Sequence, residues 1–303
     1  MAVLLLVSIA SFGMLELLPG NLAYTLLGEG AQPADLARVE KELGLDRPMP
    51  ERFFRWLGNA ITGDFGKSYT SGETVWHAIS QRLPVSLELM IGAQVLALLI
   101  ALPLGLWAGY REGSAVDRMI SSIAFGVLAV PHFVLGIVLL LLLAVWLRWL
   151  PASGFVRLEA DPIGNIRSMI LPCLTLALVE APVYLRLLRS DVASTLREEF
   201  VVVARAKGLS DWRILLTHVL RPSSFSLVTV MGINIGHLIG GAVVIETLFA
   251  LPGVGRLLIE SINNRDLVMV QGVVLFTAAS FVLVNLLVDT IYAVLDPRLR
   301  HGR

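Results

Sequence analysis

The sequence predicts an all-α, polytopic membrane protein with six transmembrane helices. Of its 303 residues, 56% are hydrophobic and only 16% are charged, which is too little charge to cover a soluble surface of that size. Long runs without charge recur along the chain, and about 20 apolar residues are enough to cross the hydrocarbon core as a helix. The formal net charge is zero, so no overall basic field points to nucleic acid as a partner.

The expected spans are bounded by charged residues. Four of the six runs carry no charge, and the other two are interrupted only by Glu16 and by Glu180. The apolar start lacks the basic region and the cleavage site of a signal peptide, so we expect it to be retained as a span. The 29 residues of 119–147 would form a helix of about 44 Å, so we expect a kink at Pro131. The runs are 1–28, 89–110, 119–147, 168–185, 222–245 and 267–288.

Two polar segments indicate the orientation in the membrane. Segment 29–83 holds seven basic and eight acidic residues, and its apolar spacing predicts helices over 36–43 and 53–61. Segment 186–221 holds seven basic residues against four acidic ones. The denser positive charge favours a cytoplasmic position for 186–221 and an outer position for 29–83, and six spans then place both termini in the cytoplasm.

The stretch GDFGKS at 63–68 has the ending of a phosphate-binding loop but not its spacing. Such a loop needs G-x-x-x-x-G-K-[ST], and Ile61 stands where the first glycine is required. The stretch also follows an amphipathic helix instead of a buried strand. We therefore expect a structured turn here, and any ATP has to be used by a partner protein.

The cysteine and histidine content offers no metal site. Cys173 is the only cysteine, so a disulfide within the chain is excluded. The histidines of the polar segments, His77, His218 and His301, show no ligand spacing such as H-x-x-x-H.

Residues 194–222 predict a helix, a tight turn and a second helix between two spans. Thr195 and Glu198 have the spacing of a capping box, and Gly208 can end the first helix in the left-handed conformation. Ser210 can cap the second helix. This elbow either docks in a groove of a soluble partner or lies on anionic lipid as an ordinary amphipathic loop. The apolar residues of the second helix at helical spacing are Trp212, Leu215, Leu216 and Val219.

The elbow carries a resemblance to a known family. Its sequence ARAKGL at 204–209, followed by HVLR at 218–221, resembles the coupling motif of ABC importer permeases in the form typical of the dipeptide/oligopeptide/nickel permease family. The resemblance covers nearly the whole chain and is closest to the first of the two permeases in such systems. The chain departs from the family pattern at two places. Pro222 stands where asparagine is expected, and the short basic leader of most relatives is missing from this sequence, which favours a start of the protein further upstream. The other matches are LPGN at 18–21, GLDRP at 44–48, GDFGKS at 63–68, RLP at 82–84, LPASG at 150–154, GGAVVIET at 240–247, PGVGR at 252–256 and LDPR at 295–298.

The resemblance implies a type I ABC importer fold in a bacterial or archaeal cytoplasmic membrane. It implies one permease domain over 1–303, with an extracytoplasmic helical insertion at 29–83 and a cytoplasmic coupling segment at 189–222. The implied partners are a second homologous permease subunit, two cytoplasmic subunits that bind ATP and magnesium, and an extracytoplasmic binding protein. The expected cargo is a di- or oligopeptide, with nickel chelates, glutathione or oligosaccharide as alternatives. No catalytic residue, metal or cofactor is expected in this chain.

The same resemblance assigns roles to two groups of residues. Small Ala204 and Ala206 would permit close approach of an ATPase, and Gly208 would set the bend of the elbow. An outer docking region for the binding protein is expected near Gly63, Asp64, Gly66 and Ser68. The full set of expected coupling residues is Ala204, Arg205, Ala206, Lys207, Gly208, Leu209 and Asp211.

A stripe of small residues marks the fifth span. Gly232, Gly236 and Gly240 recur every four residues, which lets another helix approach closely. Asn234 and His237 lie beside the stripe. They either face the translocation pathway at an interface between permeases, or they satisfy neighbouring backbone groups within the bundle.

Acidic residues within or near spans are candidates for function. Glu180 either meets the amine of a peptide or pairs with Arg186 or His132 in the same chain. Glu246 and Asp289 fall near span ends, where structural salt bridges are expected.

Two other classes of protein are alternatives to an ATP-driven importer. A proton-coupled secondary carrier would use Glu180 and Asp289 as a proton relay, but the sequence lacks the internal inverted repeats of such carriers. An intramembrane enzyme has no support from an HExxH or GxSxG motif. Uptake that depends on ATP and on a separate ATPase would distinguish the importer from both.

Overall fold

The computed structural model describes residues 2–17, 47–68 and 70–295. Every regular element in these ranges is a helix, and the β pairing found there is one isolated antiparallel bridge between Lys67 and Thr74. Several predicted features lie outside the described residues, namely the LPGN match, the helix over 36–43, Gly44 to Asp46 of the GLDRP match and residues 296–298 of the LDPR match.

Four helical stretches are long and apolar enough to cross a membrane. They belong to α5 (Val75–Tyr110), α8 (Pro162–Thr195), α10 to α11 (Asp211–Gly236) and α13 (Leu267–Leu295, of which Leu267–Val288 qualifies). The runs predicted over 89–110, 168–185 and 267–288 lie within three of these stretches, and the fourth stretch covers the predicted run 222–245 as far as Gly236. The first predicted span begins with α1 (Ala2–Leu17), and its remainder lies outside the described residues.

The run 119–147 is divided at Pro131 into a sharply bent pair of helices. The chain bends by 103° between α6 (Ala115–Leu128) and the stretch His132–Trp146, which consists of α7 (His132–Leu139) and the π-helix η1 (Leu140–Trp146). Proline lacks the N–H that would continue the preceding helix, so the chain re-enters helical geometry only after it. The predicted kink is confirmed, and with this pair counted as one span the described chain holds up to five spans.

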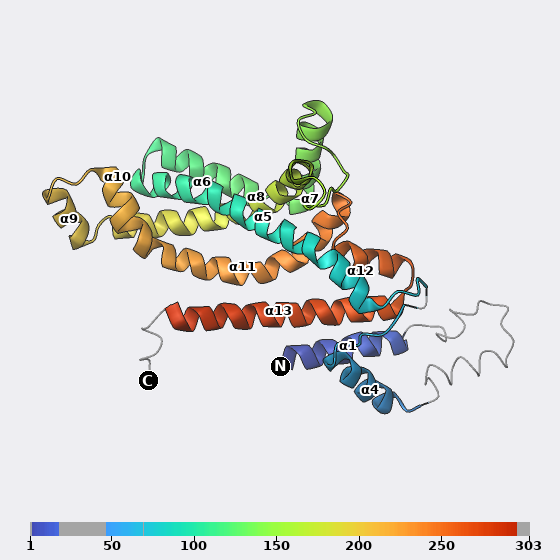
Figure 1. Ribbon diagram of the computed structural model, residues 1–303. Helices are drawn as coiled ribbons and strands as arrows, with labels where there is room; N and C mark the ends of the chain where they lie inside the picture. Colours follow the sequence, from blue (N-terminus) through green and yellow to red (C-terminus); the bar gives the residue numbers. More distant parts are fainter. Residues whose placement is uncertain (1, 18–46, 69, 296–303) are drawn as a thin grey trace, which may run out of the picture. The chain divides into compact units, whose positions relative to one another are not determined.

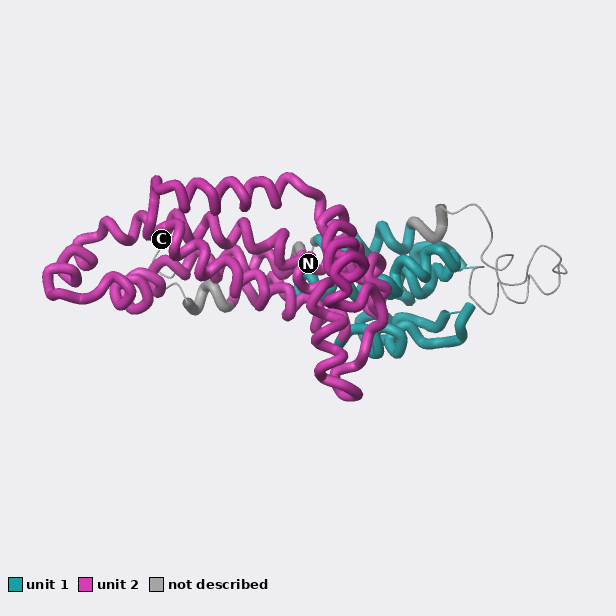
Figure 2. The backbone as a smooth tube through the Cα atoms, turned by 90° about the horizontal axis from the view of Figure 1, so that it is seen from above, with its two compact units in different colours: residues 1–84, 256–283 teal, residues 85–255, 284–303 magenta. Residues whose placement is uncertain are grey.

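The chain divides into two compact units (Figure 2). The larger unit, 85–255 with 284–303, contains a bundle in which α8 packs against α6, α7 and α11 (Figure 1). Some 72% of the most apolar stretch of α8 is buried, against 28–39% for the other three spanning stretches. Helix α8 is therefore the enclosed helix of the bundle.

Glycines bring α5 close to α8 along the larger unit. A Cβ atom at Gly109 would lie 2.7 Å from Val192 Cβ, and one at Gly92 would lie 2.6 Å from the sulfur of buried Cys173. The Cys173 thiol lies 3.7 Å from the Leu89 carbonyl oxygen of α5. Side chains at these two glycine positions would force the helices apart.

The smaller unit, 1–84 with 256–283, contains α1, α4 (Met49–Ile61) and most of α12 (Val254–Asn263). The helix predicted over 53–61 is confirmed, and its Phe53 and Trp56 rings pack on Phe12 of α1 at centroid distances of 5.5 and 5.8 Å. Two other apolar residues of the predicted helix, Phe54 and Ile61, are instead 69% and 79% exposed. The packed face of α4 is therefore narrower than its apolar spacing indicates.

Candidate functional site

The elbow predicted over 194–222 consists of three short helical pieces. α9 (Glu199–Ala206) is followed by Gly208, whose φ of +77° confirms the left-handed turn, and then by α10 (Asp211–Arg213) and the π-helix η2 (Ile214–Val219). The predicted capping box is wrong. Thr195 is the last residue of α8, and the extended backbone at Glu198 (φ −71°, ψ 148°) separates α8 from α9. The Thr195 hydroxyl instead accepts a hydrogen bond from Ser223 of α11 (Leu220–Leu248), at 3.1 Å.

The π-helix changes which residues of the second helix face inward. Leu215 and Val219 are buried as predicted, but Trp212 and Leu216 are 68% and 53% exposed, and Ile214 is buried in their place. A π-helix closes i to i+5 contacts, so Ile214 and Val219 share a face that the 3.6-residue spacing of an α-helix does not give. The four residues predicted to share one apolar face are therefore divided between a buried side, with Leu215 and Val219, and an exposed side, with Trp212 and Leu216.

The elbow has a small apolar core and an exposed apolar surface. Val201, Ala204 and Ile214 pack with residues at the ends of α5 and α8, so the elbow is attached firmly to the bundle. Ala204 is 7% exposed, and it belongs to this internal core instead of an outward face, whereas Ala206 is exposed. The large apolar side chains left exposed on the elbow are Phe200, Val202, Val203, Trp212 and Leu216.

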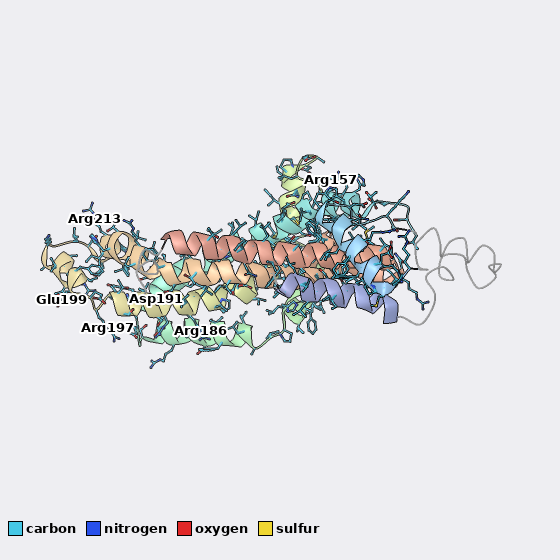
Figure 3. The ribbon with its side chains drawn as sticks, turned by 90° about the horizontal axis from the view of Figure 1, so that it is seen from below. Arg157, Arg186, Asp191, Arg197, Glu199 and Arg213 are labelled. Atoms are coloured by element: carbon cyan, nitrogen blue, oxygen red, sulfur yellow. The ribbon has the colours of Figure 1, made fainter. Side chains whose placement is uncertain are left out.

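Polar contacts fix the turn of the elbow to the end of α5. The Tyr110 hydroxyl donates to Asp211 Oδ2 at 2.8 Å, and Arg205 Nε lies 3.6 Å from Asp211 Oδ1. Figure 3 shows Glu199 and Arg213 at this end of the larger unit, while Arg157 lies at its other end. Of the expected coupling residues, Arg205, Ala206, Lys207, Gly208 and Asp211 are exposed, and Leu209 is partly buried.

Two ion pairs join neighbouring segments near the elbow, and they differ in burial. Asp117 of α6 accepts two hydrogen bonds from Arg189 of α8, both at 2.6 Å, and its side chain is only 4% exposed. Arg197 pairs with Glu112 at 2.5 Å, with side chains 74% and 38% exposed. Removal of one partner is therefore costly for the first pair, because it leaves a buried charge unpaired, and costs little for the second.

A chain of polar side chains crosses the middle of the bundle. Asn234 Nδ2 of α11 donates to Glu180 Oε2 of α8 at 2.5 Å. One turn further along α8, the Tyr184 hydroxyl lies 3.1 Å from the Gln94 side-chain amide of α5. Glu180, Tyr184 and Gln94 are buried, while Asn234 is partly exposed. The structure thus brings together two predicted pathway residues that lie 54 positions apart.

The glycine stripe of α11 meets the chain's own last helix at one end. A Cβ atom at Gly232 would lie 2.5 Å from Val288 of α13, so this glycine permits a contact within the larger unit. Gly236 is buried, whereas Gly240 is exposed and has no atom within 4 Å of an added Cβ. The side chain of His237 lies outside the described residues.

The other intramembrane charges have local roles. Glu246 is fully buried and accepts a hydrogen bond from Ser86 at 2.6 Å, and Ser86 accepts one from the Val254 N–H at 2.9 Å. Arg186 lies over the Phe125 ring at 5.0 Å. Glu246 therefore ties α11 to α5 and to the turn after α11, and the side chain of Asp289 lies outside the described residues.

The GDFGKS stretch forms the structured turn that its spacing predicts. Gly63 and Gly66 have φ values of +90° and +91°, and the Gly66 N–H donates to Asp64 Oδ1 at 3.0 Å. Gly63, Asp64 and Lys67 are exposed, but Ser68 is only 1% exposed, so its side chain is not part of the outer surface.

Several structural residues were not identified from the sequence. Gln94, Tyr184 and Asp117 hold the bundle together, and polar residues inside or beside apolar runs are the signal that could have found the first two. Asp266 was also missed, although an aspartate directly before an apolar helical run is a typical N-cap. Among the described residues, no three His, Cys, Asp or Glu side chains gather as metal ligands would.

Comparisons with known proteins agree over almost the whole chain. The family described as "Binding-protein-dependent transport system inner membrane component" matches residues 101–301, and its N-terminal companion matches 1–90. A relative from Brucella abortus is 40% identical over 299 residues, covering 99% of this chain and 95% of the relative. The dipeptide transport system permease protein of Escherichia coli and the di/tripeptide transport system permease protein of Pseudomonas aeruginosa are each 34% identical, covering 98% of this chain and 95% of theirs.

A solved structure shares the fold. The inward-facing MetNI methionine ABC transporter matches with a TM-score of 0.58 at 16% identity, covering 72% of this chain and 95% of that chain.

The buried ion pair predicts a clear difference between two arginine substitutions. Arg189→Ala should lower the free energy of unfolding by about 3 kcal/mol, because it leaves the buried Asp117 carboxylate without its bidentate partner. Arg197→Ala should lower it by less than about 1 kcal/mol, because both partners of that pair are exposed. Denaturation of the purified protein in detergent measures both values, and equal losses would contradict the assignment.

Proposed function

This chain belongs to the family of binding-protein-dependent transport system inner membrane components, and we propose that it is the first of two permease subunits of an ATP-driven peptide importer. The observation that carries the proposal is its 34–40% identity over 98–99% of its length to relatives that include a dipeptide and a di/tripeptide permease. The same machinery carrying nickel chelates, glutathione or oligosaccharide is the second candidate.

The proposed assembly contains three other kinds of component. A second homologous permease completes the pathway, two cytoplasmic subunits bind ATP and magnesium, and an extracytoplasmic binding protein delivers the cargo. The permease lies in a bacterial or archaeal cytoplasmic membrane with six spans and with both termini in the cytoplasm. Segment 29–83 forms an extracytoplasmic insertion and segment 189–222 the cytoplasmic coupling segment of the single domain 1–303.

The surface of the elbow supports a role in coupling. An exposed apolar side chain in an aqueous segment costs free energy unless a partner covers it, and Phe200, Trp212 and Leu216 are 45%, 68% and 53% exposed. The basic side chains of Arg205 and Lys207 lie on the same element and are also exposed. We assign this surface to the groove of an ATPase subunit, in preference to lipid, because the elbow is anchored to α5 and α8 by its own core. Movement of the ATPase then displaces both helices.

The polar chain in the bundle supports a position beside the translocation pathway. Glu180 and Asn234 contact each other across α8 and α11, and Asn234 is partly exposed. Exposed Gly240 marks a surface of α11 that another helix can approach closely, and we assign it to the second permease. Gly232 and Gly236 are assigned to packing within the chain, and His237 to the pathway with Asn234.

The outer turn supports a docking region for the binding protein. Gly63 and Asp64 are exposed at its tip and Gly66 is half-buried, held in one conformation by the turn's own hydrogen bonds. A rigid, polar surface loses little conformational entropy when a protein binds it. Ser68 lies beneath this surface.

Reconstituted uptake tests the proposed function. Proteoliposomes that contain both permeases and both ATPase subunits, with ATP inside, should accumulate radiolabelled dialanine when the binding protein is supplied outside. Vesicles without the ATPase subunits should accumulate none. Accumulation driven by a proton gradient in those vesicles would favour a secondary carrier, and uptake of nickel chelate, glutathione or oligosaccharide without dialanine would favour the second candidate.

Gly208→Val should uncouple ATP hydrolysis from uptake. The φ of +77° at Gly208 is costly for a β-branched residue, so the bend between α9 and α10 has to change. The measurement is the amount of dialanine imported per ATP hydrolysed. Gly126→Val is the control, because Gly126 lies inside α6 with no atom within 4 Å of an added Cβ. Normal uptake by Gly208→Val would contradict the role of the elbow.

The double variant Asn234→Ala/His237→Ala should alter the affinity or the rate of uptake, because both side chains are assigned to the pathway. Initial rates over a range of dialanine concentrations measure the two quantities separately. Thr247→Ala serves as the control, because the exposed Thr247 hydroxyl bonds back to the Val243 carbonyl of the same helix. Unchanged affinity and rate in the double variant would assign the two residues to bundle packing instead.

A further inference from the structure

The turn at 63–68 is attached to the first residues of α13. Ser68 Oγ donates a hydrogen bond to Asp266 Oδ2 at 2.5 Å, across 198 positions of sequence. Both residues are buried, with Ser68 1% and Asp266 8% exposed. This contact lies entirely within the smaller unit, and it joins the outer turn to the start of a spanning helix.

Asp266 has two roles that use different oxygen atoms. Its Oδ1 accepts a hydrogen bond from the Met269 N–H at 3.2 Å, which caps the N-terminus of α13. Its Oδ2 holds Ser68, and a hydrogen bond to a carboxylate is among the stronger ones in proteins. The cap of α13 and the anchor of the turn are therefore one side chain.

Close packing surrounds this link on both sides of the turn. A Cβ atom at Gly66 would lie 3.1 Å from Val268, and one at Gly272 would lie 3.2 Å from Phe65 and 2.5 Å from Val75. No space is left for the turn to slide along α13.

Three aromatic rings add to the packing between the turn, α5 and α13. The Phe65 ring stacks on Trp76 at 6.2 Å, and Trp76 meets Phe276 of α13 at 6.1 Å. The turn, the beginning of α5 and the first half of α13 therefore form one packed body.

We propose that Ser68 and Asp266 are positioning residues that pass the docking of the binding protein to helix α13. The proposal rests on the proposed function. A docked protein touches the exposed tip at Gly63 and Asp64, but it cannot touch Ser68, which is buried behind the tip. A displacement of the tip reaches α13 through the Ser68–Asp266 hydrogen bond. Because α13 is a continuous helix from Leu267 to Leu295, its first turn carries the displacement into the membrane.

The test measures ATP hydrolysis by the complete complex in lipid nanodiscs. The rate is followed without the binding protein and over a range of concentrations of the cognate binding protein, used with the ligand it carries when purified. Ser68→Ala removes the donor of the link. Asp266→Ser keeps an N-cap side chain for α13 but has no second oxygen for Ser68.

In both variants the maximal stimulation of ATP hydrolysis by the binding protein should be about tenfold smaller than in the wild type. A factor of that size is expected for the loss of a hydrogen bond to a buried charged group. The binding-protein concentration that gives half of the maximal effect should stay near that of the wild type, because the docking surface is unchanged. The double variant should lose no more than either single variant, because each removes the same link. Ser261→Ala is the matched control, since Ser261 is equally buried in this unit but its hydroxyl bonds to Leu257 of its own helix.

Three results would overturn the proposal. They are wild-type stimulation in both single variants, additive losses in the double variant, or an equal loss in Ser261→Ala, which would indicate general damage to the unit. A wild-type complex that imports no dialanine but is stimulated by its binding protein would refute the peptide assignment and leave this test valid. A wild-type complex without any stimulation would refute both.

Discussion

The buried helix α8 holds its neighbours through polar contacts that have no substitute inside a membrane. Within the bundle, Tyr184 meets α5 through Gln94 and Glu180 meets α11 through Asn234. Outside the predicted spans, near the elbow, Arg189 adds a contact with α6 through Asp117. The hydrocarbon core offers no water to an unpaired polar group, so slipping one neighbour along α8 would leave amide or carboxylate atoms unsatisfied. Apolar side chains alone tolerate such slippage, because lipid is as apolar as they are. The register of the bundle therefore depends on a few polar pairs on one helix.

This arrangement gives the elbow a stiff attachment. The elbow follows α8 directly in sequence, its core packs against the ends of α5 and α8, and Tyr110 adds a hydrogen bond to Asp211. Gly109 lets α5 approach α8 so closely that little room remains for relative movement. A displacement imposed on the exposed face of the elbow is consequently passed to two helices together, as a coupling element requires. The turn at 63–68 is also firmly attached, since Asp266 both caps α13 and accepts a hydrogen bond from Ser68.

The sequence predicts the elements of this structure better than their partners. Apolar runs identify the four spanning stretches of the described residues, Pro131 the break and Gly208 the left-handed turn, because each follows from a local property of the chain. The sequence does not predict the π-helix at 214–219, since nothing local distinguishes it from an α-helix. Trp212 and Leu216 are therefore expected on one face with Leu215 and Val219, but in the structure they are exposed while the other two are buried. The sequence identifies Glu180 and Asn234 as candidate residues of the pathway. It does not predict the contact between them, because that contact depends on the packing of two helices. The link from Ser68 to Asp266 is beyond local inference for the same reason.

The enclosed position of Cys173 has a practical consequence. Its sulfur lies between α8 and the backbone of α5, where a Cβ at Gly92 would come within 2.6 Å of it, and it is 4% exposed. A thiol in such apolar surroundings is a poor nucleophile, because only the thiolate reacts. Since Cys173 is the only cysteine in the chain, a new cysteine at the tip of the outer turn or on the elbow would be its one accessible thiol. A spectroscopic probe attached there would then follow the proposed docking region or the proposed coupling segment without any alteration of the native residue.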